Sequence, residues 1–533
     1  MAASAPATSK RKKRPRRNTA AAKTVSPVRA PVTLVHGRSD LIHAELFGNE
    51  AGDDEDKEVL DSYFLDKQEF DNFYSPTTKI AFVRSRKGVG KSALLRQTHF
   101  TRQKQSDAGE LLIYLKASDL IAIQEISTSS PNDLIYGWQQ RICTQINREL
   151  GASLSLGFSD DSMMLIESAE LSNFRNKNLV SALIDRLRFK GLGVEIDRSR
   201  PAISDSQALL TRVMEKKDIL VWIFIDDIDA TFLNTEHERL KASTFFSACR
   251  NLSNTVEGLC IRASVRTDVW SVLAQYDEAL DKCEQYMLDL TWSTIETGKI
   301  IDNKILSYFS RYYPDDPKFQ ALQKAPDGHV IRNIVFHEPF PWGARRSLES
   351  FRPIHILSAG RPRWAAQLCK LSGKEAFNKR ARLISIGHVR AVLREYGRKR
   401  LDDLYKEHRH QCPTLQNLVE SFSGGPRRFN TDSLLDFVAD KIIRKFGLPL
   451  IDGVTPARGA VAVAHFLFRI GFIAARDDSD ATGLGFIRFE ERPNRLSTDA
   501  NLDDGLEWEI HPSYRQVLRI KGFDQDPSVE GDF

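Results

Sequence analysis

The run Gly90-Lys91-Ser92 has the residue types needed to bind the phosphates of a nucleoside triphosphate. It stands between a short apolar, β-rich run, Lys79–Val83, and a segment with helical character, Lys91–Gln97. In such a loop, backbone N–H groups converge on a phosphate at a helix N-terminus, the lysine bridges two phosphates and the hydroxyl ligates Mg²⁺. The sequence predicts that the nucleotide is bound by Arg86, Lys87, Gly88, Val89, Gly90, Lys91, Ser92 and Ala93, with Ser92 as a metal ligand.

One position departs from the usual pattern G-x-x-x-x-G-K-[ST], because Ser85 stands where the first glycine is expected. Serine has less backbone freedom than glycine. This position supplies no phosphate ligand, however, and Gly88 adds flexibility inside the loop. We therefore expect nucleotide binding to survive the substitution.

A group of carboxylates follows the strongly apolar run Ile219–Ile225, which has the character of a strand buried on both faces. An acid at the end of a strand that neighbours the loop can complete a magnesium site. We expect Asp226 to hold the metal through water and Asp227 to polarise the attacking water, with Asp229, two residues further on, as the weaker candidate. Taken alone, the carboxylates could equally cap a turn after a core strand.

Arginines are placed where they could sense the γ-phosphate. Arg266 follows the predicted strand Leu259–Val265, while Arg361 and Arg363 open a predicted helix. We expect Lys91, Asp227, Arg266 and Arg363 to be the catalytic residues, with surface arginines as the alternative reading. The stretch Thr267–Tyr286, where ring-forming motors usually carry an arginine that acts on a neighbouring subunit, has none. This favours a slow, switch-like ATPase.

The elements expected around these residues indicate an α/β fold, because short apolar strands alternate with helices up to residue 293. Helices then dominate (Thr294–Arg311, Pro362–Leu371, His388–Tyr405), separated by a poorly patterned connection at 312–350. Near the C-terminus a helix Asp432–Phe446 and a second one, with Thr455 as cap and Pro456 at its first position, precede three short strands, Phe472–Arg476, Phe486–Glu490 and Glu507–His511. We therefore predict a parallel-sheet P-loop NTPase core at 41–293 with an insertion at about 152–203, a helical lid at 294–411 and a winged-helix domain at 412–533.

Charge is unevenly distributed along the 533 residues. The net charge is +5, but residues 1–30 hold nine Lys and Arg and no acid, which leaves −4 for the rest. We predict that residues 1–40 are a disordered basic tail, whose stretch Lys10–Arg17 binds nucleic acid or merely aids solubility. The six scattered cysteines, without a C-x-x-C pair, and the lack of a long apolar run predict a cytoplasmic protein without disulfides or membrane contact. A metal site at His408–Cys412 is disfavoured because no second group of metal-ligating residues lies at a suitable spacing from it.

Several segments together resemble the bacterial P-loop ATPases typed by an uncharacterised cyanobacterial protein, a group close to the STAND and KAP NTPases. The resemblance runs from about residue 44 to 520 and rests on LFGNE (46–50), RKGVGKSAL (86–94), FIDDID (224–229), SVRTDVW (264–270), LDLTW (288–292), GRPRW (360–364) and the terminal FLFRIGFIAA…WEIHPSYR. It implies an AAA+-like ATPase core, a helical lid and a regulatory or nucleic-acid-reading winged helix, and many relatives are thought to serve in defence against phage.

Three functions follow as hypotheses. The first is an ATP- and Mg²⁺-dependent signalling ATPase, of a bacterial conflict system, whose nucleotide state gates self-assembly or a separate effector protein. The second is an ATP-dependent DNA-binding protein that uses the basic tail and the winged helix. The third is a nucleotide-binding scaffold without hydrolysis. No N-K-x-D guanine motif follows the strands, so ATP is the expected nucleotide.

Overall fold

The computed structural model describes most of the chain outside its N-terminal segment and a long internal stretch. All described residues belong to one compact unit, His36–Phe533. The predicted basic tail up to residue 36, with Lys10–Arg17, and almost all of the predicted insertion lie outside them. The described residues are 37–50, 52, 54–105, 110–121, 130–153, 220–230, 232–233, 235–342, 346–452, 459–477, 485–493, 495–496 and 505–521.

The predicted tail ends earlier than residue 40. A 3-10 helix, η1 (Arg38–Ile42), begins within it, and Leu41 on this helix is 2% exposed. Leu41 belongs to a hydrophobic cluster with residues of the central helices. The packing of this leucine therefore holds η1, which begins inside the predicted tail, against the folded protein.

The core is a five-stranded sheet whose strand order is β2-β3-β4-β1-β5. All neighbouring strands are parallel, which confirms the predicted α/β class. The strands are β1 (Ile80–Ser85), β2 (Glu110–Lys116), β3 (Leu220–Asp226), β4 (Leu259–Arg266) and β5 (Met287–Asp289).

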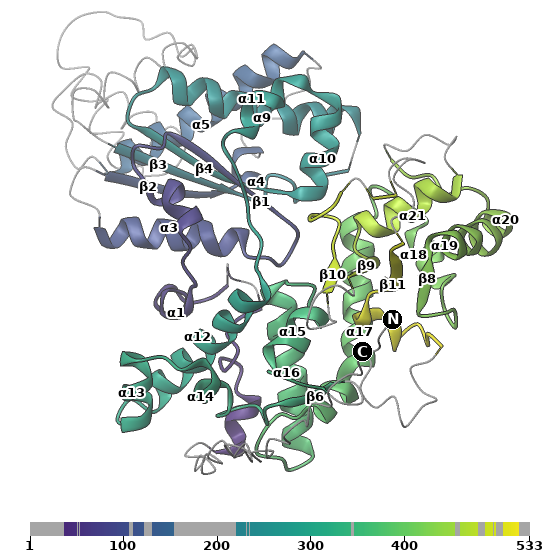
Figure 1. Cartoon of the computed structure of the whole chain (residues 1–533). Helices are drawn as coiled ribbons and strands as arrows, with labels where there is room; N and C mark the ends of the chain where they lie inside the picture. The colour runs from purple at the N-terminus through teal and green to yellow at the C-terminus, as the bar shows by residue number, and fades with distance from the viewer. Residues whose placement is uncertain are drawn as a thin grey trace, which may run out of the picture. The chain divides into compact units, whose positions relative to one another are not determined.

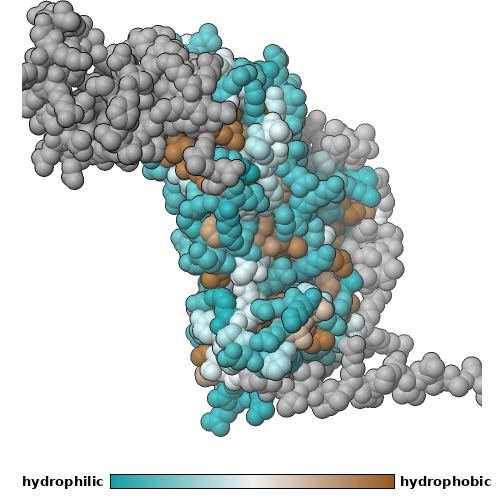
Figure 2. All heavy atoms as spheres, turned by 90° about the vertical axis from the view of Figure 1, so that its left-hand side faces the viewer, coloured by the Kyte–Doolittle hydropathy of each residue, from teal (hydrophilic) through white to brown (hydrophobic). Residues whose placement is uncertain are grey.

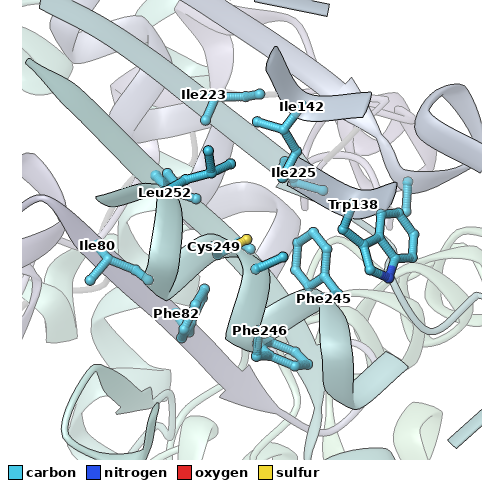
Figure 3. Packing of buried hydrophobic residues seen from close by; sticks show 14 of the residues in the cluster. Ile80, Phe82, Trp138, Ile142, Ile223, Ile225, Phe245, Phe246, Cys249 and Leu252 are labelled. Atoms are coloured by element: carbon cyan, nitrogen blue, oxygen red, sulfur yellow. The ribbon is translucent and has the colours of Figure 1, made fainter. Parts of the chain in front are cut away.

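Helices cover both faces of this sheet, as the lack of alternation in β3 predicts. Val221, Ile223 and Ile225 pack on one side with α5 (Pro131–Ser153) and α9 (Glu236–Thr255). Figure 3 shows Ile223 and Ile225 among Trp138 and Ile142 of α5 and aromatic side chains of α9. On the other side Trp222 and Phe224 belong to a cluster with leucines of α3 (Lys91–Gln105). Figure 1 shows α3 on the face opposite α5 and α9.

Shorter elements complete the core. Before β1 lie α1 (Lys57–Tyr63), η2 (Gln68–Phe70) and α2 (Asp71–Tyr74), and α4 (Ala117–Ile121) follows β2. Between β4 and β5 lie α10 (Thr267–Tyr276), η3 (Glu278–Leu280) and α11 (Asp281–Glu284).

The central part is helical, as predicted, but the segment that connects its helices has more regular secondary structure than its sequence pattern indicates. The prediction of a poorly patterned segment at 312–350 is wrong, because the segment holds two helices and two paired antiparallel strands. Arg332 explains this order, since the buried guanidinium pairs with Asp302, Glu338 and Glu349. The elements are α12 (Thr294–Tyr312), α13 (Pro317–Lys324), α14 (Gly328–Arg332), β6 (Phe340–Trp342), β7 (Arg346–Leu348), α15 (Phe351–Leu357), α16 (Pro362–Asn378) and α17 (Ile386–His408).

The C-terminal part has the predicted winged-helix pattern of helices followed by a small antiparallel sheet. Its four-stranded sheet has the order β10-β9-β11-β8, so one strand, β8, was not predicted. The predicted stop at Gly447 is confirmed by its φ of 79°; Thr455 and Pro456 lie outside the described residues. The elements are α18 (Leu415–Glu420), β8 (Arg428–Asn430), α19 (Thr431–Phe437), the π-helix η4 (Val438–Ile443), α20 (Arg444–Phe446), α21 (Gly459–Arg469), β9 (Ile473–Asp477), β10 (Gly485–Ile487), β11 (Glu507–Ile510) and α22 (Pro512–Arg515).

Hydrophilic side chains dominate the described surface seen in Figure 2, where hydrophobic residues form small separate areas. None of the described helices combines the length and apolar character needed to cross a membrane. The six cysteines are buried and free. Within the described residues no group of three or more His, Cys, Asp or Glu side chains has the geometry of a metal site.

Candidate functional site

The predicted phosphate loop lies between the end of β1 and the start of α3. Its two glycines have left-handed backbone conformations, with φ of 80° at Gly88 and 121° at Gly90, which L side chains adopt only with strain. Ser85 is still part of β1 and pairs with Arg266 of β4. A strand residue needs no positive φ, which explains why serine replaces glycine here without disturbing the loop.

The two glycines face different surroundings. A Cβ atom on Gly90 would have no neighbour within 4 Å, so only backbone strain opposes a side chain there. On Gly88 it would lie 3.1 Å from the Cβ of Arg363, at the start of α16. Gly88 therefore allows close packing of α16 on the loop.

A cavity of about 400 Å³ lies over the loop and the first turn of α3. Its polar lining includes Lys91 and Ser92 of the loop and three charged groups at the carboxyl edge of the sheet, Asp227, Asp229 and Arg266. Arg363 lines it from α16. The other lining residues are Asn49, Glu50, Gly52, Leu60, Tyr63, Phe64, Leu65, Lys87, Gly88, Val89, Gly90, Ala93, Ala230, Trp292, Ile300, Lys304 and Pro362.

Lys91 and the carboxylates lie together, as the sequence predicts. Burial lowers the pKa of the Lys91 ammonium, and the nearby charges of Asp229 and Asp226 oppose this shift. The Nζ atom of Lys91 donates to the carbonyl oxygens of Ser85 (3.1 Å) and Arg86 (3.5 Å). The ammonium is thus directed along the loop, at the carboxyl edge of the sheet.

Asp226 and Asp227 have different surroundings. Asp226 is 2% exposed and accepts hydrogen bonds from Tyr114 Oη (3.1 Å), the Asp227 N–H (3.0 Å) and Ser264 Oγ. It does not line the cavity, so the predicted contact with the metal through water stays a prediction. Asp227 is exposed, has a φ of 60° and lines the cavity. Strained backbone of this kind is frequent at active sites.

Asp229 is more closely involved in the site than its sequence position suggested. It is 4% exposed, lines the cavity, and accepts a hydrogen bond of 2.5 Å from the N–H of Arg266. Burial raises the pKa of Asp229, and the charges of Arg266 and Lys91 oppose this. The turn after β3 returns this carboxylate to the sheet edge, a placement that the i+3 spacing from Asp226 could have indicated.

The two predicted sensor positions differ in their contacts. Arg266 lines the cavity, but its guanidinium is held by Asp268 and donates to the carbonyl oxygen of Glu407 on α17 (3.2 Å). Arg363 also lines the cavity, and its guanidinium has no hydrogen bond or ion pair with any residue that the structure describes. A phosphate sensor role for each stays a prediction.

Arg361, two residues before Arg363, faces another direction. Its guanidinium pairs with Glu407 at 2.9 Å and donates to the carbonyl oxygen of Lys87 (3.2 Å). Burial raises the pKa of Glu407, but the charges of Arg361, His408 and Arg266 lower it overall. Glu407 therefore links the end of β4 to the phosphate loop through two arginines.

The outer carbonyl groups of the phosphate loop are bound by distant parts of the chain. Trp292 Nε1 donates to the carbonyl of Val89 (2.8 Å), and the N–H of Arg363 to that of Gly88 (3.2 Å). With the contact of Arg361 on Lys87, three successive carbonyls are held from outside. These bonds fix the loop with its N–H groups available on the opposite side.

The side chain of Arg86 does not line the cavity, so the predicted contact of this residue with the nucleotide stays a prediction. Its side chain extends to the winged-helix part, where it pairs with Glu490 and donates to the carbonyl oxygen of Arg469 (2.6 Å). A Cβ atom on Gly471 would lie only 2.8 Å from its Nη1 atom. The side chain is used for contact between domains, and no local pattern predicts this.

The apolar part of the cavity was missed by reasoning from residue spacing. It is formed by α1 and the residues after it, by Trp292 and by Ile300 of α12. The resemblance pointed to Trp292 through the segment Leu288–Trp292, and to the polar lining residues Asn49 and Glu50 through Leu46–Glu50. The buried Lys304 of α12 also lines the cavity and was not singled out.

The residues present fit a magnesium-bound nucleoside triphosphate. The loop offers N–H groups at the N-terminus of α3, an ammonium and a hydroxyl, and Asp227 and Asp229 provide oxygen ligands of the kind that Mg²⁺ prefers. Apolar and aromatic side chains beside this polar end suit a base. Lys91 and Ser92 would hold phosphates and metal, with Asp226 behind them.

Comparison with known protein families and with curated proteins finds no match. Among solved structures, the chain is similar to the Aeropyrum pernix ORC2 protein in its ADPNP–ADP complexes, with 12% identity and a TM-score of 0.38, over 86% of this chain and 91% of that one. It is also similar to Cdc6p from Pyrobaculum aerophilum, with 12% identity and a TM-score of 0.30, over 93% of this chain and 97% of that one. A third similar structure is the Aeropyrum pernix ORC1 protein in complex with DNA, with 13% identity and a TM-score of 0.29, over 87% of this chain and 97% of that one.

The strand order and the loop define the fold independently of these similarities. A parallel sheet ordered β2-β3-β4-β1-β5, with the loop after its first strand, is the core of an AAA+-type P-loop NTPase. The chain has this fold. The predicted fold class, with its helical lid and winged helix, is confirmed.

Proposed function

We propose that this protein binds ATP with Mg²⁺ and hydrolyses it slowly, as a regulatory ATPase. The observation that carries the proposal is the joint lining of one cavity by the loop residues Lys91 and Ser92 and by the carboxylates Asp227 and Asp229. Lys91 and the loop N–H groups bind the phosphates, Ser92 ligates the metal, and Asp226 holds the metal through water. The exposed Asp227 orients and polarises the attacking water, in the role of a general base.

Slow turnover is supported by the way the arginines are held. The Arg266 guanidinium pairs with Asp268 and Asp229 and donates to the Glu407 carbonyl, so the charge that would stabilise the transition state is engaged in the protein. Arg363 lies free of such partners among the described residues and is the better candidate for contact with the γ-phosphate. Because Arg363 lies on α16, this contact would couple hydrolysis to the lid.

We further propose that the nucleotide state gates self-assembly or a separate effector protein. The contacts of the phosphate loop with the start of α16 and with the winged-helix part support this, since a change in the loop reaches both parts directly. The resemblance to the group near the STAND and KAP NTPases is what supports a role in bacterial defence against phage.

A second candidate function is DNA binding that ATP strengthens. It is favoured by exposed basic side chains on η4 and α20, namely Lys441, Arg444 and Lys445. Together with the basic tail they would bind phosphate backbones, with a strong dependence on salt. Removal of residues 1–30, and separately Lys441→Glu with Lys445→Glu, should abolish salt-sensitive DNA binding and leave ATP turnover intact; unchanged DNA binding in both variants rejects this candidate.

The ATPase proposal is tested with three variants of the full-length protein. Lys91→Ala should abolish Mg-ATP binding in calorimetry, and Asp227→Ala should retain binding but lose turnover. Lys104→Ala is the control, because this exposed lysine of the same helix pairs with Asp61 outside the cavity. A flat binding trace for the wild-type protein rejects the proposal. Mg-ATP binding without turnover in the wild-type protein supports a scaffold without hydrolysis, and full turnover in Asp227→Ala rejects the role given to this carboxylate.

A further inference from the structure

Lys304 of α12 is a buried lysine in the lining of the proposed nucleotide cavity. Its Nζ atom donates to the carbonyl oxygen of Phe47 (2.9 Å) and lies 4.7 Å from the ring centre of Tyr63. An ammonium has three N–H donors. In the described part of the structure only one of them has a hydrogen-bond acceptor.

The charge of Lys304 is not matched by a carboxylate at ion-pair distance among the described residues. The nearest acid that acts on it is Glu55, whose Oε2 atom is already hydrogen-bonded to Tyr63 Oη (2.9 Å) and to the N–H of Asn49 (2.5 Å). Burial of an unmatched charge is costly, and it lowers the pKa of Lys304 to about 8. A lysine kept at such a position is better explained by a ligand than by stability.

Lys304 and Lys91 act on different parts of the cavity. The charged groups around Lys91 are Asp229, Asp226, Arg266 and Asp268, whereas those around Lys304 are Glu55 and Lys370. The cavity lining also includes Leu60 and Tyr63 of α1 and Ile300, which lies four residues before Lys304 on the same helix. Phosphates belong at the first end and an uncharged ring system at the second.

We propose that Lys304 is a specificity-determining residue that donates a hydrogen bond to an acceptor atom on the purine base of the bound nucleotide. The inference rests on the proposed function. Tyr63 and Ile300 supply apolar contact for the ring, and the ammonium supplies a directional contact that a hydrocarbon lining lacks. A nucleotide with an acceptor at that edge of the base binds more tightly than one without it.

The test measures the affinities of wild type, Lys304→Met and Lys304→Gln for Mg-ATP, Mg-GTP and magnesium tripolyphosphate, which has no base. Lys304→Met should weaken Mg-ATP binding by about tenfold, the effect of one hydrogen bond to a charged group, and Lys304→Gln, which keeps a donor, by less. Tripolyphosphate should bind all three proteins equally. Lys299→Met, an exposed lysine of the same helix, is the matched control and should change nothing.

Analogues of ATP then locate the acceptor. Binding is measured for 1-deaza-, 3-deaza- and 7-deaza-ATP, each of which lacks one ring nitrogen of the base. For the analogue that lacks the contacted nitrogen, Lys304→Met should cause no further loss of affinity, as in a double-mutant cycle. If Lys304→Met loses as much affinity for tripolyphosphate as for Mg-ATP, or loses no affinity for either nucleotide, the inference is overturned while the ATPase proposal stands. Failure of the wild-type protein to bind any probe overturns both.

Discussion

Arg86 of the phosphate loop forms an ion pair with Glu490, which lies more than 400 residues further along the chain in the winged-helix part. The same guanidinium donates to the carbonyl oxygen of Arg469 at the end of α21. The side chain of Glu490 is 30% exposed and that of Arg86 15%. A residue one step from the proposed nucleotide-binding N–H groups thus holds a separate domain.

We predict that Arg86→Ala loosens the winged-helix part from the loop. The variant leaves Glu490 and the Arg469 carbonyl without their donor, at a cost of about 1–3 kcal/mol. Hydrogen exchange should rise in 459–477 and 485–493, and the double variant with Glu490→Ala should add little more. Arg311→Ala, which removes a pair with Glu45 elsewhere, is the control; equal protection in wild type and Arg86→Ala would show that the pair does not hold the domain.

Gly90→Ala should abolish nucleotide binding with only a small loss of stability. The alanine is strained at a φ of 121°, by about 1–2 kcal/mol, and its methyl group would project toward the cavity side without meeting protein atoms. Gly424→Ala is a matched control, since Gly424 also has a positive φ (67°) and no neighbour within 4 Å of the added Cβ atom. Calorimetry and thermal unfolding distinguish the two, and equal nucleotide affinity in both variants would contradict the proposed role of Gly90.

Glu407→Gln should destabilise the protein by about 3 kcal/mol, because it leaves the Arg361 guanidinium buried without a carboxylate. The free energy of unfolding in urea measures this. Glu395→Gln on the same helix removes only an exposed pair with Lys399 and should cost less than about 1 kcal/mol. ATP turnover should fall in Glu407→Gln alone, since Arg361 also holds the Lys87 carbonyl of the loop; similar losses in both variants would refute this link.

Acid should destabilise the protein partly through His355. Its Nε2 atom accepts from Arg488 (2.6 Å) and its Nδ1 atom contacts Thr297 Oγ1 (2.8 Å), so the folded protein requires the neutral ring. Burial, together with the charge of Arg488, lowers the pKa of His355 from 6.5 to about 3.

The sign of the pH effect follows from this shift. Between pH 6.5 and about 3 only the unfolded chain protonates this histidine, so stability is lost as the pH falls, by about 1.4 kcal/mol per pH unit. His355→Gln should make the unfolding free energy less steep by about that amount between pH 6 and 4, with His329→Gln, an exposed histidine, as control. An unchanged slope would mean that His355 is not neutral in the folded state.

Features that depend on neighbouring residues follow from the sequence alone. Continuous apolar runs such as that of β3 predict strands buried on both sides, and Gly90-Lys91-Ser92 predicts the turn into α3. The stop at Gly447 needed only a residue that tolerates a positive φ. These signals are local because periodicity and backbone freedom act over a few residues.

Which polar groups meet depends on how the whole chain packs. This packing turned Arg86 toward Glu490, enclosed Asp226 behind Asp227, brought Asp229 to the cavity and placed Lys304 beside the apolar pocket. It also ordered the segment 312–350 through the ion pairs of Arg332. A charged side chain has many possible partners in the sequence, and its choice depends on the burial and spacing that packing creates between residues hundreds of positions apart.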